Sequence, residues 1–261
     1  MVDPYLSLLR YIEEKTGFKC FNYKEKPLKR RLAVRMRALN LKDYAAYQTY
    51  IQNTPRELMI LLDTIPINLS YFYRNPEVFD YFQKDIIPKI INNQQLRFWS
   101  AGCAAGEEVY SIVIALLEAL GDAESKFLIK VFGTDVDAQA IAQAQKGLYT
   151  DFALAYMPSS LVERYFRKKN GMYEIDLSLR RYVEFLCMDL FQPPPFRAID
   201  VVFCRNVLIY FARDAQKRLL QIIYDTLRPD GYLILGKTEI ILGTDGFKII
   251  NPRERIYQKI S

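Results

Sequence analysis

Two short segments of the sequence combine small and acidic residues in ways that could do chemistry, and each follows an apolar run. The first, residues 99–108, reads Trp-Ser-Ala-Gly-Cys-Ala-Ala-Gly-Glu-Glu. Its small residues would let a ligand lie against the backbone at a sheet edge, although a purely structural turn could have the same composition. Glu107 and Glu108 would repel a phosphate, so they suit a cationic ligand such as a sulfonium or an amino group. The segment matches neither the dinucleotide fingerprint nor the phosphate loop.

The second segment is Gly-Thr-Asp-Val-Asp at residues 133–137, after another apolar run. A carboxylate at this place can accept both hydroxyls of a ribose, as it does in nucleotide-binding α/β folds. The alternative is that either aspartate only caps the following helix. We expect Asp135 to bind the ribose and Asp137 to be the cap.

Histidine is absent from all 261 residues. Its absence excludes Ser-His-Asp and Cys-His catalysis and removes the usual general base and most transition-metal sites. The four cysteines lie far apart and form no Cys-x-x-Cys pair, so we expect neither a disulfide nor a metal site. Any reaction must proceed without imidazole.

Alternating strand and helix patterns predict the element order that would position these residues. Short apolar runs predict strands, and longer amphipathic runs predict helices. Such an alternation favours a mainly parallel, doubly wound sheet. A turn signal, Pro229-Asp230-Gly231, ends the last helix, and an Asn170-Gly171 pair predicts a hairpin within a small β insertion. The expected strands are Leu96–Ser100, Leu128–Gly133, Val183–Met188, Ile199–Cys204, Tyr232–Leu235 and Arg255–Ile260, and the expected helices are Glu107–Leu120, Ala138–Gln145 and Ala212–Leu227.

The first 66 residues differ from the rest in pattern and charge. Apolar stripes at helical spacing predict helices, including one whose stripe is Leu28, Leu32, Met36 and Leu39. These residues carry 12 Lys and Arg against 7 Asp and Glu, a net charge of +5 out of +6 for the chain. Such a region implies an acidic partner, which could be nucleic acid, anionic lipid or a carboxylate-rich protein. No apolar run approaches the ~20 residues of a membrane span, and the chain does not start as a signal peptide, so we expect a cytoplasmic protein.

Four segments resemble motifs of one family. Residues 64–74, Thr-Ile-Pro-Ile-Asn-Leu-Ser-Tyr-Phe-Tyr-Arg, are similar to T-N-x-T-x-F-F-R, and residues 99–111 are similar to W-S-A-G-C-S-T-G-E-E-P-Y-S. Residues 203–211, Phe-Cys-Arg-Asn-Val-Leu-Ile-Tyr-Phe, resemble F-C-R-N-V-M-I-Y-F, and residues 227–239 resemble L-K-P-G-G-x-L-x-x-G-H-S-E. These are motifs of CheR-type chemoreceptor glutamate methyltransferases, and they span nearly the whole chain in the right order.

The resemblance implies an α/β fold, that of a class I Rossmann-like methyltransferase with a mainly parallel seven-stranded sheet. It implies a basic helical domain over residues 1–66 and an S-adenosylmethionine (SAM)-binding domain over residues 67–261, with a β insertion at about 148–182. The implied reaction moves a methyl group from SAM to glutamate side chains of chemoreceptors, without a metal. A glutamate carboxylate is ionised at neutral pH and needs no base to act as a nucleophile, which suits a chain without histidine.

The resemblance also assigns residues to the site. Arg74 would hold one carboxylate oxygen of the acceptor, and Tyr210 would orient its approach, although a core tyrosine is the alternative for Tyr210. Glu108 could replace Glu107 as the cofactor contact. Four sites depart from the family, since Ser70, Ala104-Ala105, Asp189 and Lys237-Thr238 replace threonine, Ser-Thr, asparagine and His-Ser. The expected cofactor-binding residues are Asn68, Ser70, Arg74, Gly102, Glu107, Asp135, Asp189, Leu190, Arg205 and Asn206.

The basic helix acquires a partner from the same resemblance, because receptor methylation regions are long helices that carry glutamates. The expected docking residues are Arg30, Arg31, Arg35 and Arg37, and a solvated surface helix is the alternative. We expect a monomer that is recruited to membrane-bound receptor arrays without inserting into the membrane. The hairpin at residues 167–175 is short for members that grip a receptor-tail peptide, so we expect no such tether.

Two rival functions use the same observations. A nucleic-acid methyltransferase would bind phosphates with the basic helix, but the sequence lacks the Asn-Pro-Pro-Tyr or Asp-Pro-Pro-Tyr element of amino methylation. We therefore expect no nucleic-acid partner. A cofactor-sensing scaffold would have lost catalysis, but Arg74, Asn206 and Tyr210 are all present.

Overall fold

The computed structural model describes residues 3–16, 20–22, 25–64, 70–92, 94–241 and 246–260. Contacts within the chain divide it into two compact units, Met1–Leu69 and Ser70–Ser261. The sequence had suggested a boundary after residue 66. None of the helices in the described ranges combines the length and the apolar character that crossing a bilayer requires.

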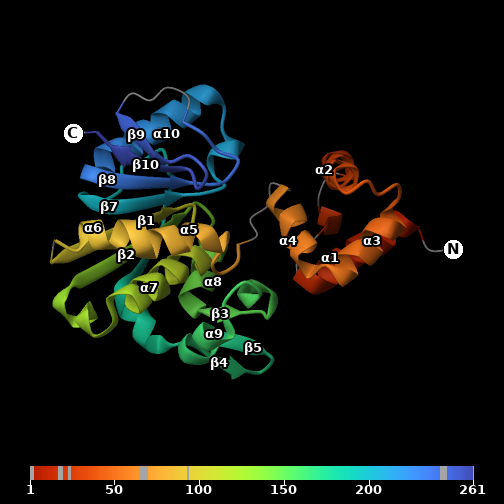
Figure 1. Ribbon diagram of the computed structural model, residues 1–261, viewed down its shortest axis with the longest axis horizontal. Coiled ribbons are helices and arrows are strands. Elements are labelled where there is room, and N and C mark those ends of the chain that lie inside the picture. Colours follow the sequence, from red (N-terminus) through yellow and green to blue (C-terminus); the bar gives the residue numbers. More distant parts are fainter. Residues whose placement is uncertain are drawn as a thin grey trace. The chain divides into compact units, whose positions relative to one another are not determined.

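The first unit consists of packed helices (Figure 1), and the apolar residues of their stripes are largely buried. The predicted stripe on the basic helix is buried at Leu28, Leu32 and Met36. Asp43 caps the third helix, because its carboxylate accepts a hydrogen bond from the Ala46 amide at 2.8 Å. The helices are α1 (Pro4–Thr16), α2 (Glu25–Ala38), α3 (Tyr44–Asn53) and α4 (Pro55–Thr64), with a 3₁₀ turn at Cys20–Asn22.

The second unit is built on a seven-stranded sheet of order β6-β2-β1-β7-β8-β10-β9 (Figure 1). The first five strands in that order are parallel, and β10 runs antiparallel to both of its neighbours. The expected α/β fold with a mainly parallel seven-stranded sheet is therefore confirmed. The strands are β1 (Gln95–Ala101), β2 (Leu128–Asp135), β6 (Val183–Cys187), β7 (Ile199–Cys204), β8 (Leu227–Leu235), β9 (Phe247–Asn251) and β10 (Ile256–Lys259).

Both faces of the sheet are covered, because successive side chains of a strand point to opposite faces. Phe98 of β1 joins the apolar cluster beneath α7 (Glu107–Leu120), together with α5 (Pro76–Tyr81) and α6 (Ile87–Ile90). Its neighbour Trp99 joins the cluster of the other face, where α10 (Arg213–Thr226) and Phe196 pack. The central strand β7 is thus buried on both sides, and functional side chains can emerge only at its end.

A second, three-stranded sheet of order β3-β5-β4 forms between α8 (Ala138–Lys146) and β6. Its strands are β3 (Leu148–Tyr149), β4 (Phe166–Lys169) and β5 (Met172–Ile175), and α9 (Ser159–Tyr165) precedes β4. The predicted hairpin is confirmed, since Asn170 and Gly171 join β4 to β5 with φ values of 50° and 76°.

Three features differ from the expected elements. The Pro229–Gly231 turn is instead an irregularity within β8, where Asp230 has a φ of 59° and the register with β7 shifts between Ile199 and Val201. Strand β9 was not expected, because its apolar and polar residues do not alternate. Its two exposed residues, Lys248 and Ile249, are consecutive. The helical run at residues 76–90 was not expected either. It contains a π turn at Phe82–Ile86, directly before Pro88, whose nitrogen cannot donate a hydrogen bond.

Candidate active site

Most of the predicted site residues lie at one edge of the main sheet. Ser100 pairs with Gly133 of β2 and with Phe203 of β7, and Asp135 pairs with Cys187 of β6. The carboxyl ends of these four parallel strands therefore lie together, which is where doubly wound sheets bind ligands. The expected residues that follow these strands are Gly102, Glu107, Asp135, Asp189, Leu190, Arg205 and Asn206.

The turn after β1 requires glycine where it approaches β7. Gly102 has a φ of 82°, and a Cβ atom there would lie 2.5 Å from Cγ2 of Val207. The amides of Gly102 and Cys103 donate to the Thr134 carbonyl oxygen at 2.8 and 2.9 Å. The Tyr149 hydroxyl donates to the Ala105 carbonyl oxygen at 3.0 Å. The turn is therefore fixed before any ligand arrives.

Asp135 and Asp137 have different partners at the end of β2. Asp137 caps α8 by accepting hydrogen bonds from the amides of Gln139 and Ala140, so its predicted role as a cap is confirmed. Asp135 is half-buried and accepts from the Ala104 amide and the Asp137 amide, each at 2.9 Å. Each carboxylate oxygen has a second acceptor position. Asp135 is thus held rigidly and can still accept hydroxyl groups.

Glu107 is a buried carboxylate in the first turn of α7, with 6 % of its surface exposed. Its Oε2 atom has no hydrogen-bond partner among the described residues. Burial raises the pKa of Glu107 to about 7, although a hydrogen bond from Ser70 opposes the rise. The amino end of α7 carries a partial positive charge that favours the ionised carboxylate. A cationic ligand group would satisfy Oε2 and keep Glu107 ionised.

Glu108 is engaged by protein groups instead. Its Oε1 accepts a hydrogen bond from the Ser100 hydroxyl at 2.7 Å, and its Oε2 pairs with Nη1 of Arg205 at 3.3 Å. The sequence left open which glutamate would contact a ligand. The tertiary structure favours Glu107, because it is the one with an oxygen atom that lacks a protein partner.

Arg205 is a buried residue directly after β7, with 1 % of its side chain exposed. Besides Glu108, its guanidinium donates to the Arg74 carbonyl oxygen at 2.8 Å and to Oδ1 of Asn75. These contacts assign it to positioning the segment that carries Arg74. Its expected contact with a cofactor stays a prediction.

The segment Ser70–Asn75 has a strained backbone and is held near the strand ends by hydrogen bonds and ring contacts. Tyr73 and Asn75 have φ values of 52° and 59°, which non-glycine residues adopt at a cost. The Tyr73 amide donates to Oγ of Ser111 at 3.0 Å, and the ring of buried Phe72 contacts other aromatic rings. These contacts bring Ser70 to Glu107 and the Arg74 backbone to Arg205.

Tyr210 lies on a 3₁₀ turn, Leu208–Tyr210, and is 48 % exposed, so the alternative of a core tyrosine is wrong. Two side chains that the sequence reasoning missed hold this turn. Glu239 accepts hydrogen bonds from the amides of Asn206 and Ile209 at 2.9 and 3.3 Å. Gln216 of α10 donates from its amide to the carbonyl oxygens at both ends of the turn.

The Gln216 hydrogen bonds measure 2.9 Å to Leu208 and 3.1 Å to Phe211. Burial raises the pKa of Glu239, and the amides that it binds oppose the rise. The only sequence signal for Glu239 was its place at the end of the motif at residues 227–239, where a buried glutamate needs several donors.

The remaining expected cofactor contacts have different surroundings. Asp189 is exposed and accepts from the Phe191 amide at 2.9 Å, while Leu190 is buried on the sheet face opposite α7. Asn68 lies outside the described residues. Within the described residues there is no group of three or more carboxylates and thiols that could hold a metal ion.

Two family models together match most of the chain. The model described as CheR methyltransferase, all-alpha domain, matches residues 4–65. The model described as CheR methyltransferase, SAM binding domain, matches residues 68–256. The chain belongs to the CheR methyltransferase family. It is therefore an enzyme that uses SAM as its methyl donor.

Individual relatives are similar over most of the chain. A protein named chemotaxis protein methyltransferase 2 from Pseudomonas aeruginosa is 33% identical, and the match covers 86% of this chain and 81% of that protein. A chemotaxis protein methyltransferase from Borreliella burgdorferi is 28% identical, with 96% and 92% covered. An uncharacterized 104.1 kDa protein from Rhodobacter capsulatus is 32% identical over 92% of this chain, which spans only 26% of that longer protein.

The four arginines of α2 that were expected to dock a substrate differ in exposure and in their partners within the all-alpha CheR domain. Arg35 forms a two-point pair with Glu57, from Nε to Oε1 at 2.8 Å and from Nη2 to Oε2 at 2.7 Å. Glu57 is 3 % exposed and also accepts from the Tyr47 hydroxyl. Arg35 therefore fastens α2 to α4 rather than facing solvent. Arg30 and Arg37 are exposed, and Arg31 is half-buried.

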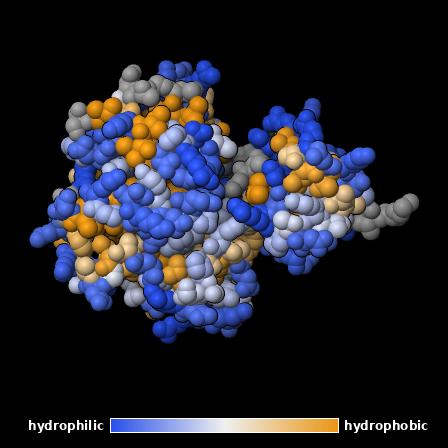
Figure 2. Space-filling model, viewed as in Figure 1, coloured by the Kyte–Doolittle hydropathy of each residue, from blue (hydrophilic) through white to orange (hydrophobic). Residues whose placement is uncertain are grey.

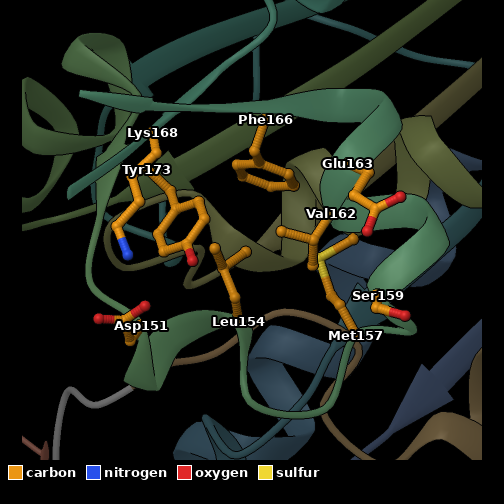
Figure 3. A pocket seen from close by; sticks show the side chains of 9 residues that line it. All are labelled: Asp151, Leu154, Met157, Ser159, Val162, Glu163, Phe166, Lys168 and Tyr173. Carbon is orange, nitrogen blue, oxygen red and sulfur yellow. The ribbon is translucent and has the colours of Figure 1, made fainter. Parts of the chain in front are cut away.

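One hollow of this CheR-family chain lies in the β insertion rather than at the strand ends (Figure 3). Its volume is about 530 Å³. Its lining includes the apolar side chains of Phe166, Tyr173 and Leu154. It also includes the charged side chains of Asp151 and Lys168 (Figure 3). None of the predicted site residues lines it. The expected absence of a receptor-tail tether is untested by this hollow and stays a prediction.

Proposed function

We propose that this enzyme transfers the methyl group of SAM to glutamate side chains of chemoreceptors, as the names of its chemotaxis relatives suggest. The observation that carries the proposal is the buried Glu107 carboxylate, whose Oε2 has no partner among the described residues. It lies at the end of strands that the SAM-binding family model covers. A carboxylate in this place suits the cationic amino end of SAM and repels phosphate-rich ligands.

The other cofactor contacts follow from the strand ends. Asp135 would accept the ribose hydroxyls with the acceptor positions that its backbone contacts leave. Asp189 and Leu190 would flank the adenine, since Leu190 is anchored in the core and Asp189 is exposed beside it. Gly102 keeps a side chain out of the turn against which the ligand would lie. Ser70, Asn206 and Asn68 complete the proposed set.

The acceptor would be used in its ionised form. SAM supplies an electrophilic methyl carbon on a positively charged sulfur, so the new carbon–oxygen bond forms while the carbon–sulfur bond breaks and its electron pair stays on sulfur. No proton moves, which suits a chain without histidine. Arg74 would hold one carboxylate oxygen, and Tyr210 would orient the other. Because Arg205 fixes the Arg74 backbone, alignment is built into the fold, and alignment can supply about 7–11 kcal/mol of the barrier.

The all-alpha domain would dock the receptor. Arg30, Arg31 and Arg37 remain accessible on α2 for carboxylates of a helical partner, while Arg35 supports the helix from within. We place the enzyme in the cytoplasm, as a monomer recruited to membrane-bound receptor arrays without a tail tether.

The test is a transfer assay with methyl-labelled SAM and membranes that carry candidate receptors. The proposal expects label on a receptor band that is released as methanol by base, the property of a carboxyl ester. Arg74→Ala should lower the rate on the order of 100-fold or more. Arg167→Ala, at a side chain that is 83 % exposed in the β insertion, is the matched control and should change little. Base-stable label, or label in nucleic acid, would contradict the proposal.

A further inference from the structure

A small hollow on α10 borders the turn that carries Tyr210. It has a volume of about 210 Å³ and is lined by Arg213, Gln216, Lys217 and Leu220. These residues recur at helical spacing, so they share one face of α10. Gln216 belongs both to this lining and to the hydrogen bonds that fasten α10 to the turn, at 2.9 and 3.1 Å. A group that occupies the hollow therefore lies beside the turn that carries Tyr210.

The two cations of the hollow lack the carboxylate partner that some other arginines of the same unit have. Arg164 pairs with Glu118 at 2.6 Å, and Arg228 pairs with Asp200 at 2.6 Å. Arg213 and Lys217 are exposed, and no hydrogen bond or ion pair engages either of them in the described part of the chain. No carboxylate is among the lining residues. The hollow thus presents two uncommitted positive charges above the partly buried Leu220.

Two large side chains are exposed on the turn beside the hollow. Ile209 is 44 % exposed and Tyr210 is 48 % exposed, on the turn that Gln216 binds. An exposed apolar pair next to uncommitted cations matches an amphipathic helix whose polar side is acidic. A nucleic acid would be held by the cations but would gain little from Ile209.

We propose that the hollow on α10 receives a carboxylate side chain of the receptor helix, one or two turns from the glutamate that is methylated. This inference rests on the proposed function and adds a rule of substrate selection to it. Arg213 and Lys217 would pair with the flanking carboxylate while Ile209 packs on the aliphatic part of the helix. One turn of helix advances about 5.4 Å, so an acidic residue three or four positions from the acceptor lies on the same face. Glutamates with such a neighbour would be methylated in preference to those without one.

The experiment uses the full chain and a soluble fragment of a chemoreceptor's cytoplasmic helices with one acceptor glutamate. A matched fragment replaces the acidic residues within two turns of the acceptor by glutamine. The variant R213E/K217E reverses the two charges of the hollow. The control variant K89E/K248E makes the same change in net charge at exposed lysines of α6 and β9. Binding of S-adenosylhomocysteine to each variant reports the integrity of the cofactor site.

We expect R213E/K217E to raise KM for the acidic fragment about five- to tenfold, with kcat and S-adenosylhomocysteine binding unchanged, as the loss of two exposed pairs predicts. For the glutamine fragment, the wild type and R213E/K217E should have the same KM. A fragment with lysines at the flanking positions should recover the activity of R213E/K217E.

Equal KM values for the wild type and R213E/K217E on the acidic fragment would overturn this inference and leave the proposed function standing. A rise in KM that K89E/K248E reproduces, or that persists on the glutamine fragment, would overturn it as well. If the wild type binds S-adenosylhomocysteine but methylates no receptor fragment, the proposed function and this inference fail together.

Discussion

Arg205 and Arg35 are both paired with a glutamate, in different units of the chain. The Arg205 side chain is 1 % exposed, and it joins Glu108 to the backbone of Arg74 across the strand ends. The Arg35 side chain is 18 % exposed, and it donates two hydrogen bonds to Glu57. The first pair organises a site, whereas the second holds two helices together.

The pairs also differ in what they leave available. Because Arg205 occupies Glu108, the neighbouring Glu107 is left with an oxygen that a ligand can use. Because Arg35 turns toward Glu57, the outer face of α2 is left to Arg30 and Arg37. Burial, rather than residue type, therefore separates the arginines that support the fold from those that can meet a partner.

The largest expected effect separates the two pairs by stability. Arg205→Met should lower the free energy of unfolding by about 3–5 kcal/mol, because it leaves the Glu108 carboxylate without its partner in a buried place. Arg35→Met should cost less, because it breaks the pair with Glu57 alone, whereas Arg205→Met also releases the Arg74 carbonyl oxygen and Asn75. Urea unfolding of both variants measures the difference. Adding Glu108→Leu to Arg205→Met should recover part of the loss. An equal cost for both single variants would break the comparison.

The second prediction concerns the glutamate that the Arg205 pair leaves available. Burial raises the pKa of Glu107 from 4.5 to about 7, so between these pH values the folded chain holds a proton that the unfolded chain releases. The contribution of Glu107 to the free energy of unfolding should therefore fall by on the order of 3 kcal/mol as pH rises from 4.5 to 7. Glu107→Gln should unfold at higher urea than the wild type at pH 8 and not at pH 4.5, in the absence of SAM.

The same substitution should affect ligand binding in the opposite direction. SAM affinity of the wild type should rise about tenfold between pH 6 and pH 8 as Glu107 ionises, because only the carboxylate attracts the cation. Glu107→Gln should bind more weakly and show a much flatter pH profile, as calorimetric titration can measure. Weak binding with an unchanged pH profile would remove Glu107 from the cofactor site.

The third prediction tests the turn of Tyr210. Gln216→Ala removes both hydrogen bonds to the turn and should lower kcat about tenfold, with unchanged SAM affinity, because misplacement affects alignment and not cofactor binding. Gln221→Ala is the matched control on the same helix, since Gln221 is exposed and its side-chain amide donates to Asp225 within the helix, away from the turn. A loss of SAM affinity in Gln216→Ala would indicate a wider structural change instead.

The smallest expected effects belong to the outer face of α2. Arg30→Ala and Arg37→Ala should each raise KM for the receptor about two- to fivefold, with the difference shrinking as salt is added. Arg35→Ala should act mainly through stability. Steady-state assays at several salt concentrations, together with unfolding curves, distinguish the two behaviours. A salt-independent KM effect of Arg35→Ala in a fully folded protein would reverse the roles assigned to these arginines.

Local patterns in the sequence were enough for most elements of the fold. The apolar run Ile199–Cys204 and the amphipathic run Glu107–Leu120 predicted β7 and α7 with their observed ends. The roles of Asp137 and the Asn170-Gly171 pair were predicted correctly because caps and tight turns depend on neighbouring residues alone. Strand β9 was missed because its apolar and polar residues do not alternate.

The sequence by itself determined the family, the chemistry that a chain without histidine can perform, and the strand ends at which the site would form. Tertiary structure alone paired Glu108 with Arg205 and left an oxygen of Glu107 without a partner among the described residues, paired Arg35 with Glu57, and brought Glu239 and Gln216 to the Tyr210 turn. The reason is the distance along the chain between partners. Arg205 lies 97 residues from Glu108, and Glu239 lies 33 residues from Asn206. Which carboxylate is neutralised and which remains for a ligand depends on packing that no local pattern contains.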